Sequence, residues 1–328
     1  MDLYEDELRE PEFAAVIPGM KPEECTLEKL RLDLAMLPPA VELTNTEKLL
    51  WKKANFTKGD SLEYIREISP YMLPFLKNRL LTVIRAPDGV DKEQFFQKHL
   101  PGYAPDYVTA IKMDDEIFCS CDNLESLVWF ANHGAVEYHV PFQRAGSVMP
   151  LEIVFDLDPP DRDHFHLAVH AAKLVKVMLD ELSLTSFVKT SGNKGLQIHI
   201  PIREGSMTYE ETAIFTQAIA FTIEKTYPDL FTTERMKAKR RGRLYIDYVQ
   251  HGKDKTIIAP YSPRKTEEGT VATPLYWEEV SETLDPLQFT IKNVGQRVKT
   301  IGCPFRGYFS AGEKQQMKKM LQLVRSGR

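Results

Sequence analysis

The stretch Glu152-Ile-Val-Phe-Asp156-Leu-Asp158-Pro-Pro160 places two aspartates, one residue apart, at the end of an apolar run that two prolines close. In a β-strand, residues i and i+2 point to the same face, so we expect Asp156 and Asp158 side by side. Two carboxylates held that close repel each other unless a cation lies between them. Their oxygen ligands suit Mg²⁺ or Mn²⁺. Taken alone, the motif favours a metal site only weakly, because such a pair is usually a capping aspartate beside a solvated one.

The overall composition is that of an ordinary globular protein. The chain has 328 residues, of which 43% are hydrophobic and 27% charged, enough for two domains or one large domain with two lobes. No apolar run approaches the ~18 residues of a membrane span, and the acidic N-terminus lacks a signal-peptide core. The four cysteines show neither a disulfide framework nor zinc-ligand spacing. We therefore expect a cytoplasmic protein without membrane partners.

The charge is unevenly distributed along the chain. A net charge of −5 argues mildly against nucleic-acid binding, since such domains are often basic. Residues 235–243, however, carry six cations and no anion. A polyanion needs only a local basic surface, so the total charge does not exclude DNA as a partner.

The periodicity of apolar residues predicts a mixed α/β fold, with hairpin-like pairs among the later strands. We expect residues 1–40 to be an acidic extension, with a short helix at Thr26–Met36, and residues 41–328 to be a single domain. Helices are expected at about 57–76, 124–132, 163–182 and 209–226. Strands are expected at 80–85, within 107–121, and at 135–139, 186–190, 196–202 and 244–248, followed by 256–261.

Two further segments carry chemistry-bearing residues. In Lys189-Thr-Ser191-Gly192-Asn-Lys194-Gly195 the glycines permit a tight turn, while a hydroxyl and an ammonium are available for phosphate oxygens. In isolation this segment is more typical of a solvated hairpin turn. Asp247 follows an apolar strand, where a third metal-binding carboxylate would be expected, although alone it is more typical of an ordinary strand-end aspartate.

In combination, these segments resemble the three motifs of the archaeo-eukaryotic primase superfamily. The resemblance is closest to the polymerase domain of the bacterial end-joining ligase D, and Thr256 and Ala259-Pro-Tyr-Ser-Pro-Arg264 continue it. It extends from about Leu43 to at least Arg264, and it implies a catalytic core of two lobes in which sheets pack against helices. Further matching blocks are Thr57-Lys-Gly-Asp60, Ala86-Pro-Asp-Gly-Val90, Phe95-Phe96-x-Lys98, Ala104-Pro105 and Glu137-Tyr-His139.

The resemblance implies nucleotidyl transfer with two metal ions, Mn²⁺ or Mg²⁺. Asp156 and Asp158 would bridge both ions, and Asp247 would complete the site that activates the primer 3′-hydroxyl. The resemblance also implies nucleotide-binding residues, and these are His139, Ser191, Gly192, Lys194, Gly195, Gln250 and Arg264. Arginine suits such a role because its guanidinium forms two parallel hydrogen bonds to phosphate.

The resemblance also implies contacts with DNA. Lys48 and Lys58 match a pocket for the 5′-phosphate of a downstream strand, although by themselves they are typical of solvated lysines beside a helix. Phe95 and Phe96 match aromatics that stack on template bases, although adjacent phenylalanines are more often core residues. The implied function is template-dependent extension of 3′ ends at breaks, gaps and overhangs, with NTPs preferred over dNTPs. The implied partners are Ku and an ATP-dependent DNA ligase, in the cytoplasm near the nucleoid.

Two residues depart from the family pattern, and two further features lie outside it. Family members commonly have His where this chain has Gln197, and Asn where it has His251, so details of nucleotide contact differ. His199 shares a strand face with Gln197, but we interpret it as a buried, hydrogen-bonded histidine. The histidines at 164, 166 and 170 lack a third clear ligand and are interpreted as a solvated helix face. Residues 8–13 and 21–26 resemble the end of a ligase oligonucleotide-binding domain, as in a fusion with the ligase placed first.

Two other functions remain open from the residues alone. Apolar residues followed by Asp-x-Asp also begin the haloacid dehalogenase-type phosphatases, in which Asp156 would be the nucleophile. That motif normally ends the first strand of its fold, whereas about 150 residues precede it here. A non-catalytic DNA-end scaffold is the second alternative, which the intact aspartates disfavour.

Overall fold

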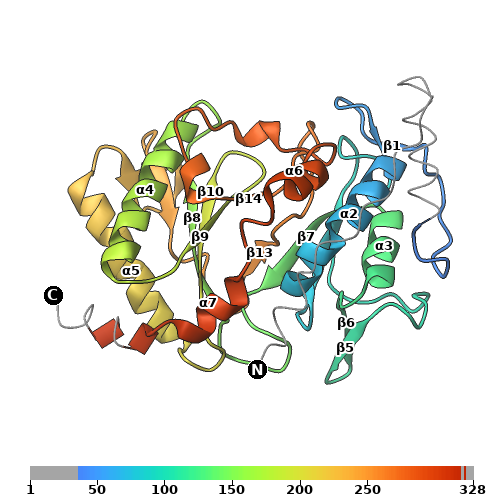
Figure 1. Ribbon diagram of the computed structural model, residues 1–328, viewed down its shortest axis with the longest axis horizontal. Coiled ribbons are helices and arrows are strands. Elements are labelled where there is room, and N and C mark those ends of the chain that lie inside the picture. Colours follow the sequence, from blue (N-terminus) through green and yellow to red (C-terminus); the bar gives the residue numbers. More distant parts are fainter. Residues whose placement is uncertain (1–35, 319–320, 323–328) are drawn as a thin grey trace. The chain divides into compact units, whose positions relative to one another are not determined.

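The computed structural model describes residues 36–318 and 321–322, and these form two compact units that the chain enters more than once (Figure 1). The first unit contains the described residues up to His139, with Tyr261–Val271 and Thr290–Gly302. The second contains Val140–Pro260, Ala272–Phe289 and the described residues from Cys303 onward. Each unit combines sheet and helices, so the prediction of a mixed α/β fold is confirmed. The expected helix at Thr26–Met36 and the ligase-like segments fall outside the described residues.

Two helices form the centre of the first unit. α2 (Lys58–Leu76) begins at Thr57, whose side chain accepts a hydrogen bond from the Asp60 backbone N–H, while the Asp60 carboxylate accepts one from the Thr57 N–H. This reciprocal capping satisfies two backbone donors that the first helical turn leaves without partners. α3 (Leu124–Asn132) begins at Asn123 in a similar way and packs against α2. Both helices match the sequence prediction.

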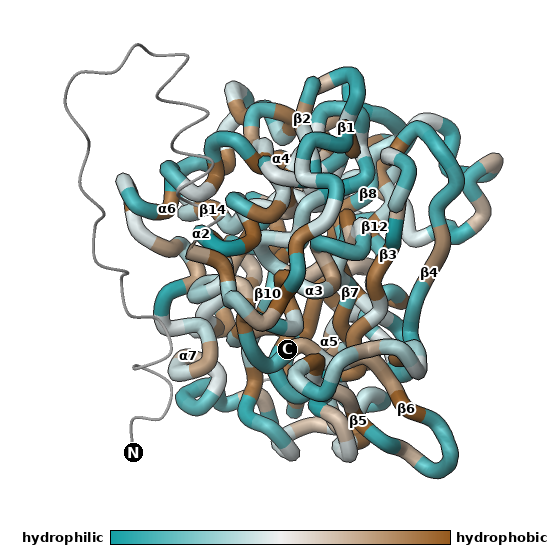
Figure 2. Tube along the Cα trace, turned by 90° about the vertical axis from the view of Figure 1, so that its right-hand side faces the viewer, coloured by the Kyte–Doolittle hydropathy of each residue, from teal (hydrophilic) through white to brown (hydrophobic). Residues whose placement is uncertain are grey.

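Short antiparallel strands complete the first unit. β3 (Thr82–Arg85) pairs with β4 (Phe95–Gln97) on one side and with β7 (Ala135–Pro141) on the other. β1 (Leu49–Trp51) pairs with β2 (Phe56–Thr57), and a short helix, α6 (Val294–Ile301), contacts α2. The expected strand region 107–121 is a hairpin of β5 (Ala110–Met113) and β6 (Glu116–Cys119), with a hydrophilic turn between them (Figure 2).

A six-stranded sheet is the framework of the second unit. Its order is β11-β12-β8-β10-β9-β14, and all neighbouring pairs are antiparallel except β11 with β12. The strands are β11 (Phe231–Thr232), β12 (Leu244–Asp247), β8 (Glu152–Asp158), β10 (Leu196–Pro201), β9 (Phe187–Thr190) and β14 (Pro274–Leu275). Three single-turn 3₁₀ helices at 237–239, 277–279 and 286–288 lie in the connections. A short strand, β13 (Thr256–Ile258), is not part of this sheet but is the edge strand of the sheet of order β13-β7-β3-β4.

The two faces of this sheet differ in polarity. α4 (Phe165–Glu181) and α5 (Tyr209–Thr226) contact each other and strand β8, and Figure 1 shows them on one side of the sheet. On β8, Ile153, Phe155 and Leu157 alternate with the acidic residues and are fully buried. Because successive side chains point to opposite faces, the acidic residues of β8 share the other face. There Tyr308 of α7 (Tyr308–Lys314) hydrogen-bonds to Glu152, whereas Asp156 and Asp158 lie at the far end of the strand.

No helix among the residues that the structure describes is long and apolar enough to cross a membrane.

Candidate active site

The three aspartates predicted from the sequence come together on two neighbouring strands of the second unit. β8 and β12 are antiparallel, and their register places Asp247 directly opposite Asp156 and Tyr245 opposite Asp158. Side chains of directly opposed residues in an antiparallel pair lie on the same face, with Cβ atoms roughly 4.5–5.5 Å apart. The pairing therefore brings residues 87 or more positions apart in sequence to one point on the sheet.

The surroundings of Asp156 and Asp247 disfavour the ionised form of both carboxyl groups. Burial raises the pKa of Asp156 to about 6, with repulsion from Asp247 and Asp158 adding to the effect of burial. Burial also raises the pKa of Asp247, although its Oδ1 accepts hydrogen bonds from the Tyr245 hydroxyl at 3.0 Å and the Gln250 N–H at 2.8 Å. Carboxylates that destabilise each other in this way are stabilised by a cation placed between them.

Asp158 is held by two cations of the protein itself. Its Oδ1 lies 2.9 Å from Lys194 Nζ, and its Oδ2 lies 3.2 Å from Arg240 Nη1. As the side chains stand, no three His, Cys, Asp or Glu residues within the described part of the chain are arranged to hold a metal ion. The donor set nevertheless fits Mg²⁺ or Mn²⁺, because it offers hard carboxylate oxygens and because burial raises the pKa of both Asp156 and Asp247. Asp158 would be able to serve as a ligand once its contacts with Lys194 and Arg240 were broken.

The predicted phosphate loop follows β9 and lies against the aspartates. The Ser191 hydroxyl accepts hydrogen bonds from the N–H groups of Asn193, at 3.4 Å, and Gly195, at 3.1 Å. Gly192 has a φ of +73°, in the left-handed region that glycine adopts without strain. A Cβ at Gly195 would lie 2.4 Å from the Leu157 carbonyl oxygen, so only glycine permits this close approach to β8. The loop glycines thus bring the Ser191 hydroxyl and the backbone beside the aspartate strand.

Lys194 points toward the Asp158 end of β8. In addition to the ion pair with Asp158, its ammonium donates to the carbonyl oxygens of Pro159 and Pro160 at 2.5 and 3.0 Å. An incoming phosphate would have to compete with these acceptors. The lysine is therefore already located at the site and needs only a side-chain rotation to change partners.

Gln197 and Lys189 extend the acidic site across the sheet. Gln197 lies opposite Asp156 on β10, and Lys189 lies opposite Gln197 on β9. The Gln197 amide donates to Asp156 Oδ1 at 3.2 Å and accepts from Lys189 Nζ at 2.5 Å. Lys189 has no role in the sequence analysis, because a lysine in a predicted strand gives no signal of burial beside a carboxylate.

Arg240 is the second residue of the site that sequence reasoning missed. Besides pairing with Asp158, its guanidinium lies 3.8 Å from the centre of the Tyr245 ring, a cation–π contact. Its signal in the sequence was the basic run 235–243, which was interpreted only as a general basic surface. The structure assigns one member of that run to the aspartate site.

Gln250 and His251 follow Asp247, and their side chains contact different parts of the chain, near Thr256 and Thr212 respectively. The Gln250 side chain donates to the Thr256 carbonyl oxygen at 2.7 Å. His251 is 2% exposed, its Nε2 lies 2.9 Å from Thr212 Oγ1, and burial lowers its pKa to about 4. His251 is thus a neutral residue of the core. His199 is also buried and lies 3.0 Å from Glu152, as interpreted from the sequence.

In the first unit, one buried carboxylate links two predicted nucleotide-binding residues. Glu137 Oε2 lies 2.9 Å from His139 Nε2, and Oε1 lies 3.2 Å from Arg264 Nε and accepts from the Lys265 N–H at 3.0 Å. Burial alone would raise the pKa of Glu137, but the bond from His139 and the charge of Arg264 outweigh it, so the pKa is lowered. Glu137 is therefore anionic and orients both side chains.

The predicted DNA-contacting residues also lie in the first unit. Lys58 is 5% exposed, and its ammonium donates to Thr44 Oγ1 at 3.1 Å and to the Asn132 carbonyl oxygen at 3.0 Å. The Lys58 N–H donates to the Lys48 carbonyl oxygen at 2.8 Å, so the two lysines are neighbours. Burial, with repulsion from Lys48, lowers the pKa of Lys58 to about 8. The Lys48 ammonium pairs with Asp88 at 2.6 Å.

Both predicted stacking residues are on the surface. Phe95 and Phe96 are 42% and 68% exposed, and the Arg85 guanidinium lies 5.1 Å from the centre of the Phe95 ring. Two adjacent exposed phenylalanines are unusual for a strand that serves only the core. Their exposure leaves the ring faces available to a ligand.

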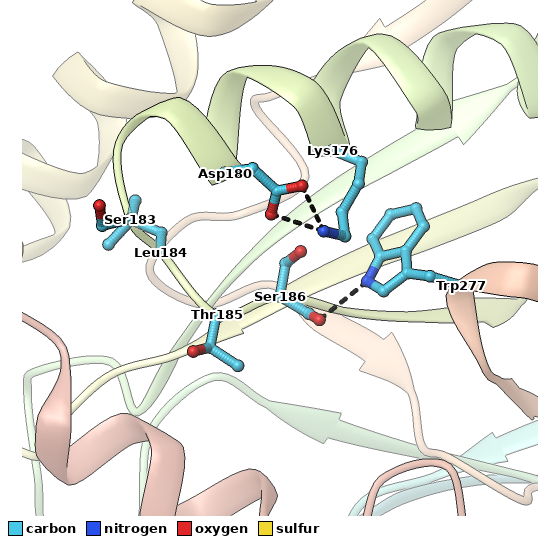
Figure 3. A pocket seen from close by; sticks show the side chains of 7 residues that line it. All are labelled: Lys176, Asp180, Ser183, Leu184, Thr185, Ser186 and Trp277. Carbon is cyan, nitrogen blue, oxygen red and sulfur yellow. Dashed lines mark hydrogen bonds and ion pairs between the residues drawn. The ribbon is translucent and has the colours of Figure 1, made fainter.

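The other candidate features do not form a competing site. His164 pairs with Asp161 at 2.6 Å, His166 is exposed, and His170 packs against the rings of Tyr227 and Phe231. A surface pocket of ≈ 370 Å³ lies where β9 begins (Figure 3). Its charged groups, Lys176 and Asp180, bind each other at 2.5 Å. None of the predicted site residues lines it.

Comparisons with known proteins agree with this geometry. The family model described as "LigD, primase-polymerase domain" matches residues 57–305. The bifunctional non-homologous end joining protein LigD of Bacillus subtilis is 43% identical over 325 residues, which cover 99% of this chain and 53% of that protein. The multifunctional LigD of Mycolicibacterium smegmatis is 31% identical over 74% of this chain and 32% of its own length. The chain thus spans about half the length, or less, of these curated relatives.

A solved structure extends the agreement to three dimensions. The polymerase domain of Mycobacterium tuberculosis ligase D, in complex with DNA, matches with a TM-score of 0.76 and 30% identity. The match covers 82% of this chain and 98% of that one. The family match over residues 57–305 and this likeness confirm the resemblance seen in the sequence. The chain belongs to the LigD primase-polymerase domain family.

Proposed function

We propose that this protein is a nucleotidyltransferase that extends DNA 3′ ends in non-homologous end joining. The observation that carries the proposal is the placement of Asp247 opposite Asp156, with the Ser191–Gly195 loop beside them. A carboxylate cluster next to a phosphate-binding loop is the arrangement that nucleotidyl transfer requires. Membership of the LigD primase-polymerase family supports the same reaction class.

Asp156, Asp158 and Asp247 would hold two divalent ions. Such ions, when bound, lower the pKa of a 3′-hydroxyl and neutralise the charge that develops on the leaving pyrophosphate. Mn²⁺ is the ion that we expect to support the highest activity. Lys194 and Arg240 pair with Asp158 in the structure, and with Asp158 bound to a metal ion they would be available to phosphate oxygens.

Several residues are proposed to bind the nucleotide. In the second unit, the Ser191 hydroxyl, Lys194 and the backbone of Gly192 and Gly195 are placed to bind phosphates. Gln250 is a weaker candidate, because its amide already donates to Thr256. In the first unit, His139 and Arg264 are oriented by Glu137, and their roles rest on the family resemblance.

The DNA partner is proposed to be a gap or end that carries a 5′-phosphate. Lys58 supports this, because its buried ammonium has neutral acceptors, Thr44 Oγ1 and the Asn132 carbonyl oxygen, within the described part of the chain and would gain from an anionic ligand. Phe95 and Phe96 are proposed to stack on template bases. Ku and an ATP-dependent ligase are proposed as partners, in line with the printed names of the LigD relatives.

The test is extension of a labelled primer on gapped DNA with Mn²⁺, comparing NTPs with dNTPs and a downstream 5′-phosphate with a 5′-hydroxyl. We expect addition of the templated nucleotide, with NTPs preferred and with stimulation by the 5′-phosphate. Lys48→Ala and Lys58→Ala should each remove the stimulation, whereas Lys299→Ala, a surface lysine that pairs with Glu67 in the same unit, should keep it. DNA binding without any addition would instead favour the non-catalytic scaffold.

The phosphatase alternative has no support in the structure. Asp156 lies on a central strand with Asp247 and Gln197 opposite it, and several strands of the chain precede it. A phosphatase of that type also leaves the Ser191–Gly195 loop unexplained. Family membership assigns the chain elsewhere.

A further inference from the structure

The face of the sheet that carries the aspartates contains a continuous row of polar side chains across four strands. Consecutive strands place Asp247 opposite Asp156, Asp156 opposite Gln197, and Gln197 opposite Lys189. Directly opposed residues point to the same side, so all four side chains share one face. The row thus begins at the proposed metal ligands and ends at a lysine that is 0% exposed.

The hydrogen bonds in the row have a fixed direction. An ammonium group has only donors, so the atom of Gln197 that faces Lys189 must be the amide oxygen. The Lys189–Gln197 distance of 2.5 Å agrees with that assignment. The amide NH₂ then has to face Asp156, where it donates to Oδ1 at 3.2 Å. The Asp156 carboxylate, when ionised, only accepts hydrogen bonds, so it favours the same orientation of the amide, and Lys189 and Asp156 fix the Gln197 side chain from its two ends.

The charge of Lys189 also matters at this position. Burial of an ammonium is unfavourable unless nearby negative charge or hydrogen bonds compensate for it. In this row Gln197 separates the Lys189 ammonium from Asp156 and Asp247, the two carboxylates that repel each other. Lys194 and Arg240 act on Asp158 instead, and both are more exposed than Lys189. Lys189 is therefore a fully buried cation whose charge favours the ionised form of Asp156.

We propose that Lys189 is a positioning residue, which acts through Gln197 to hold the Asp156 carboxylate in the orientation that binds the metal ion. The proposal rests on the assignment of Asp156 as a metal ligand. It also gives Gln197 a function in this chain that differs from nucleotide contact. Groups that hydrogen-bond to metal-binding side chains typically change metal affinity by about 10–100-fold when they are removed.

The test is a double-mutant cycle on Mn²⁺ affinity, measured without nucleotide or DNA by the electron paramagnetic resonance signal of free Mn²⁺. Lys189→Met and Gln197→Leu should each weaken Mn²⁺ binding by about tenfold. Because Lys189 is proposed to act through Gln197, which donates to Asp156 Oδ1, the double variant should be no weaker than either single variant. Lys176→Met, on the surface of α4 in the same unit, is the matched control and should leave the affinity unchanged.

A rescue variant separates positioning from a merely structural role. Gln197→His retains one donor and one acceptor nitrogen, so it can accept from Lys189 and donate to Asp156. We expect the Mn²⁺ affinity of this variant to lie within about threefold of the wild-type affinity. Gln197→Leu, which cannot make these hydrogen bonds, should lose about tenfold. Thermal unfolding of every variant shows whether it is folded at the temperature of the titration.

Two outcomes would overturn the proposal. One is that Lys189→Met and Gln197→Leu are folded and bind Mn²⁺ with the same affinity as the wild type. The other is additive losses in the double variant, which would mean that the two residues act independently. Absence of Mn²⁺ binding by the wild type would overturn the metal site itself, and with it the proposed function, so the two failures are distinguishable.

Discussion

Asp247 lies directly opposite Asp156 on the neighbouring antiparallel strand, so the sheet holds two carboxylates together where their charges repel. Like charges in directly opposed positions destabilise a sheet. The fold therefore retains a pair of mutually repelling aspartates, Asp156 and Asp247, at the site that we propose for nucleotidyl transfer. Conflicts of this kind between stability and local charge are characteristic of functional sites.

This pair predicts opposite effects of one substitution on stability and on activity. Asp156→Asn removes the repulsion and keeps the shape, so in the absence of metal it should stabilise the protein by about 1–3 kcal/mol at neutral pH. The same change should abolish nucleotide addition. Chemical denaturation with chelator present gives the first quantity, and primer extension gives the second. Added Mn²⁺ should raise the unfolding temperature of the wild type but not that of the variant.

His251 predicts a loss of stability in acid. Its folded-state pKa of about 4 lies below the unfolded value of about 6.5, so the unfolded chain binds the proton more readily between these values. The contribution of His251 is therefore fully present above about pH 6.5 and is lost as the pH falls toward 4. His251→Asn should make the free energy of unfolding less dependent on pH in this window. An unchanged pH profile in the variant would contradict the buried neutral histidine.

Lys58 predicts that recognition of the 5′-phosphate weakens at alkaline pH. Burial lowers the Lys58 pKa to about 8, so the ammonium loses its proton as the pH rises through that value. The ratio of affinities for DNA with a 5′-phosphate and with a 5′-hydroxyl should therefore fall between about pH 7 and pH 9. Fluorescence anisotropy with both DNAs measures the ratio. In Lys58→Ala the ratio should be near one and independent of pH.

Glu137 predicts a loss of nucleotide binding from a residue that need not touch the nucleotide. Glu137→Gln keeps the size of the side chain but removes the charge that orients His139 and Arg264. We expect about a tenfold weaker affinity for a fluorescent NTP, since charge-assisted hydrogen bonds contribute about 1.5–3 kcal/mol. Discrimination between 5′-phosphate and 5′-hydroxyl DNA should be unchanged. Glu116→Gln, on the exposed β5–β6 hairpin, is the control.

Local signals in the sequence predicted much of the fold. The capping residues Thr57 and Asp60 marked the start of α2, and the apolar period placed α4 within two residues of its observed ends. The three motifs were found because each combines a strand with residues typical of metal or phosphate binding. Such patterns are local, so one sequence is enough to show them.

Features that depend on strand pairing could not be predicted in this way. The positions of Lys189 and Gln197 beside Asp156 depend on the register of β9 and β10, which only the folded sheet shows. Arg240 was hidden among the cations of the basic run, and nothing in that run marks which one reaches Asp158. Two lobes were expected, but the segments that make up each unit were not predicted, because residues 261–271 and 290–302 rejoin the first unit from a distant part of the chain.

The most direct test of the central claim is addition of a single nucleotide to a primer–template in Mn²⁺, with each of the four template bases in turn. We expect the complementary nucleotide to be added in each case by the wild type. Asp247→Asn should show no addition while unfolding at the same or a higher temperature than the wild type. Addition that persists in Asp247→Asn, or none by folded wild-type protein with either Mn²⁺ or Mg²⁺, would contradict the assignment of these aspartates to nucleotidyl transfer.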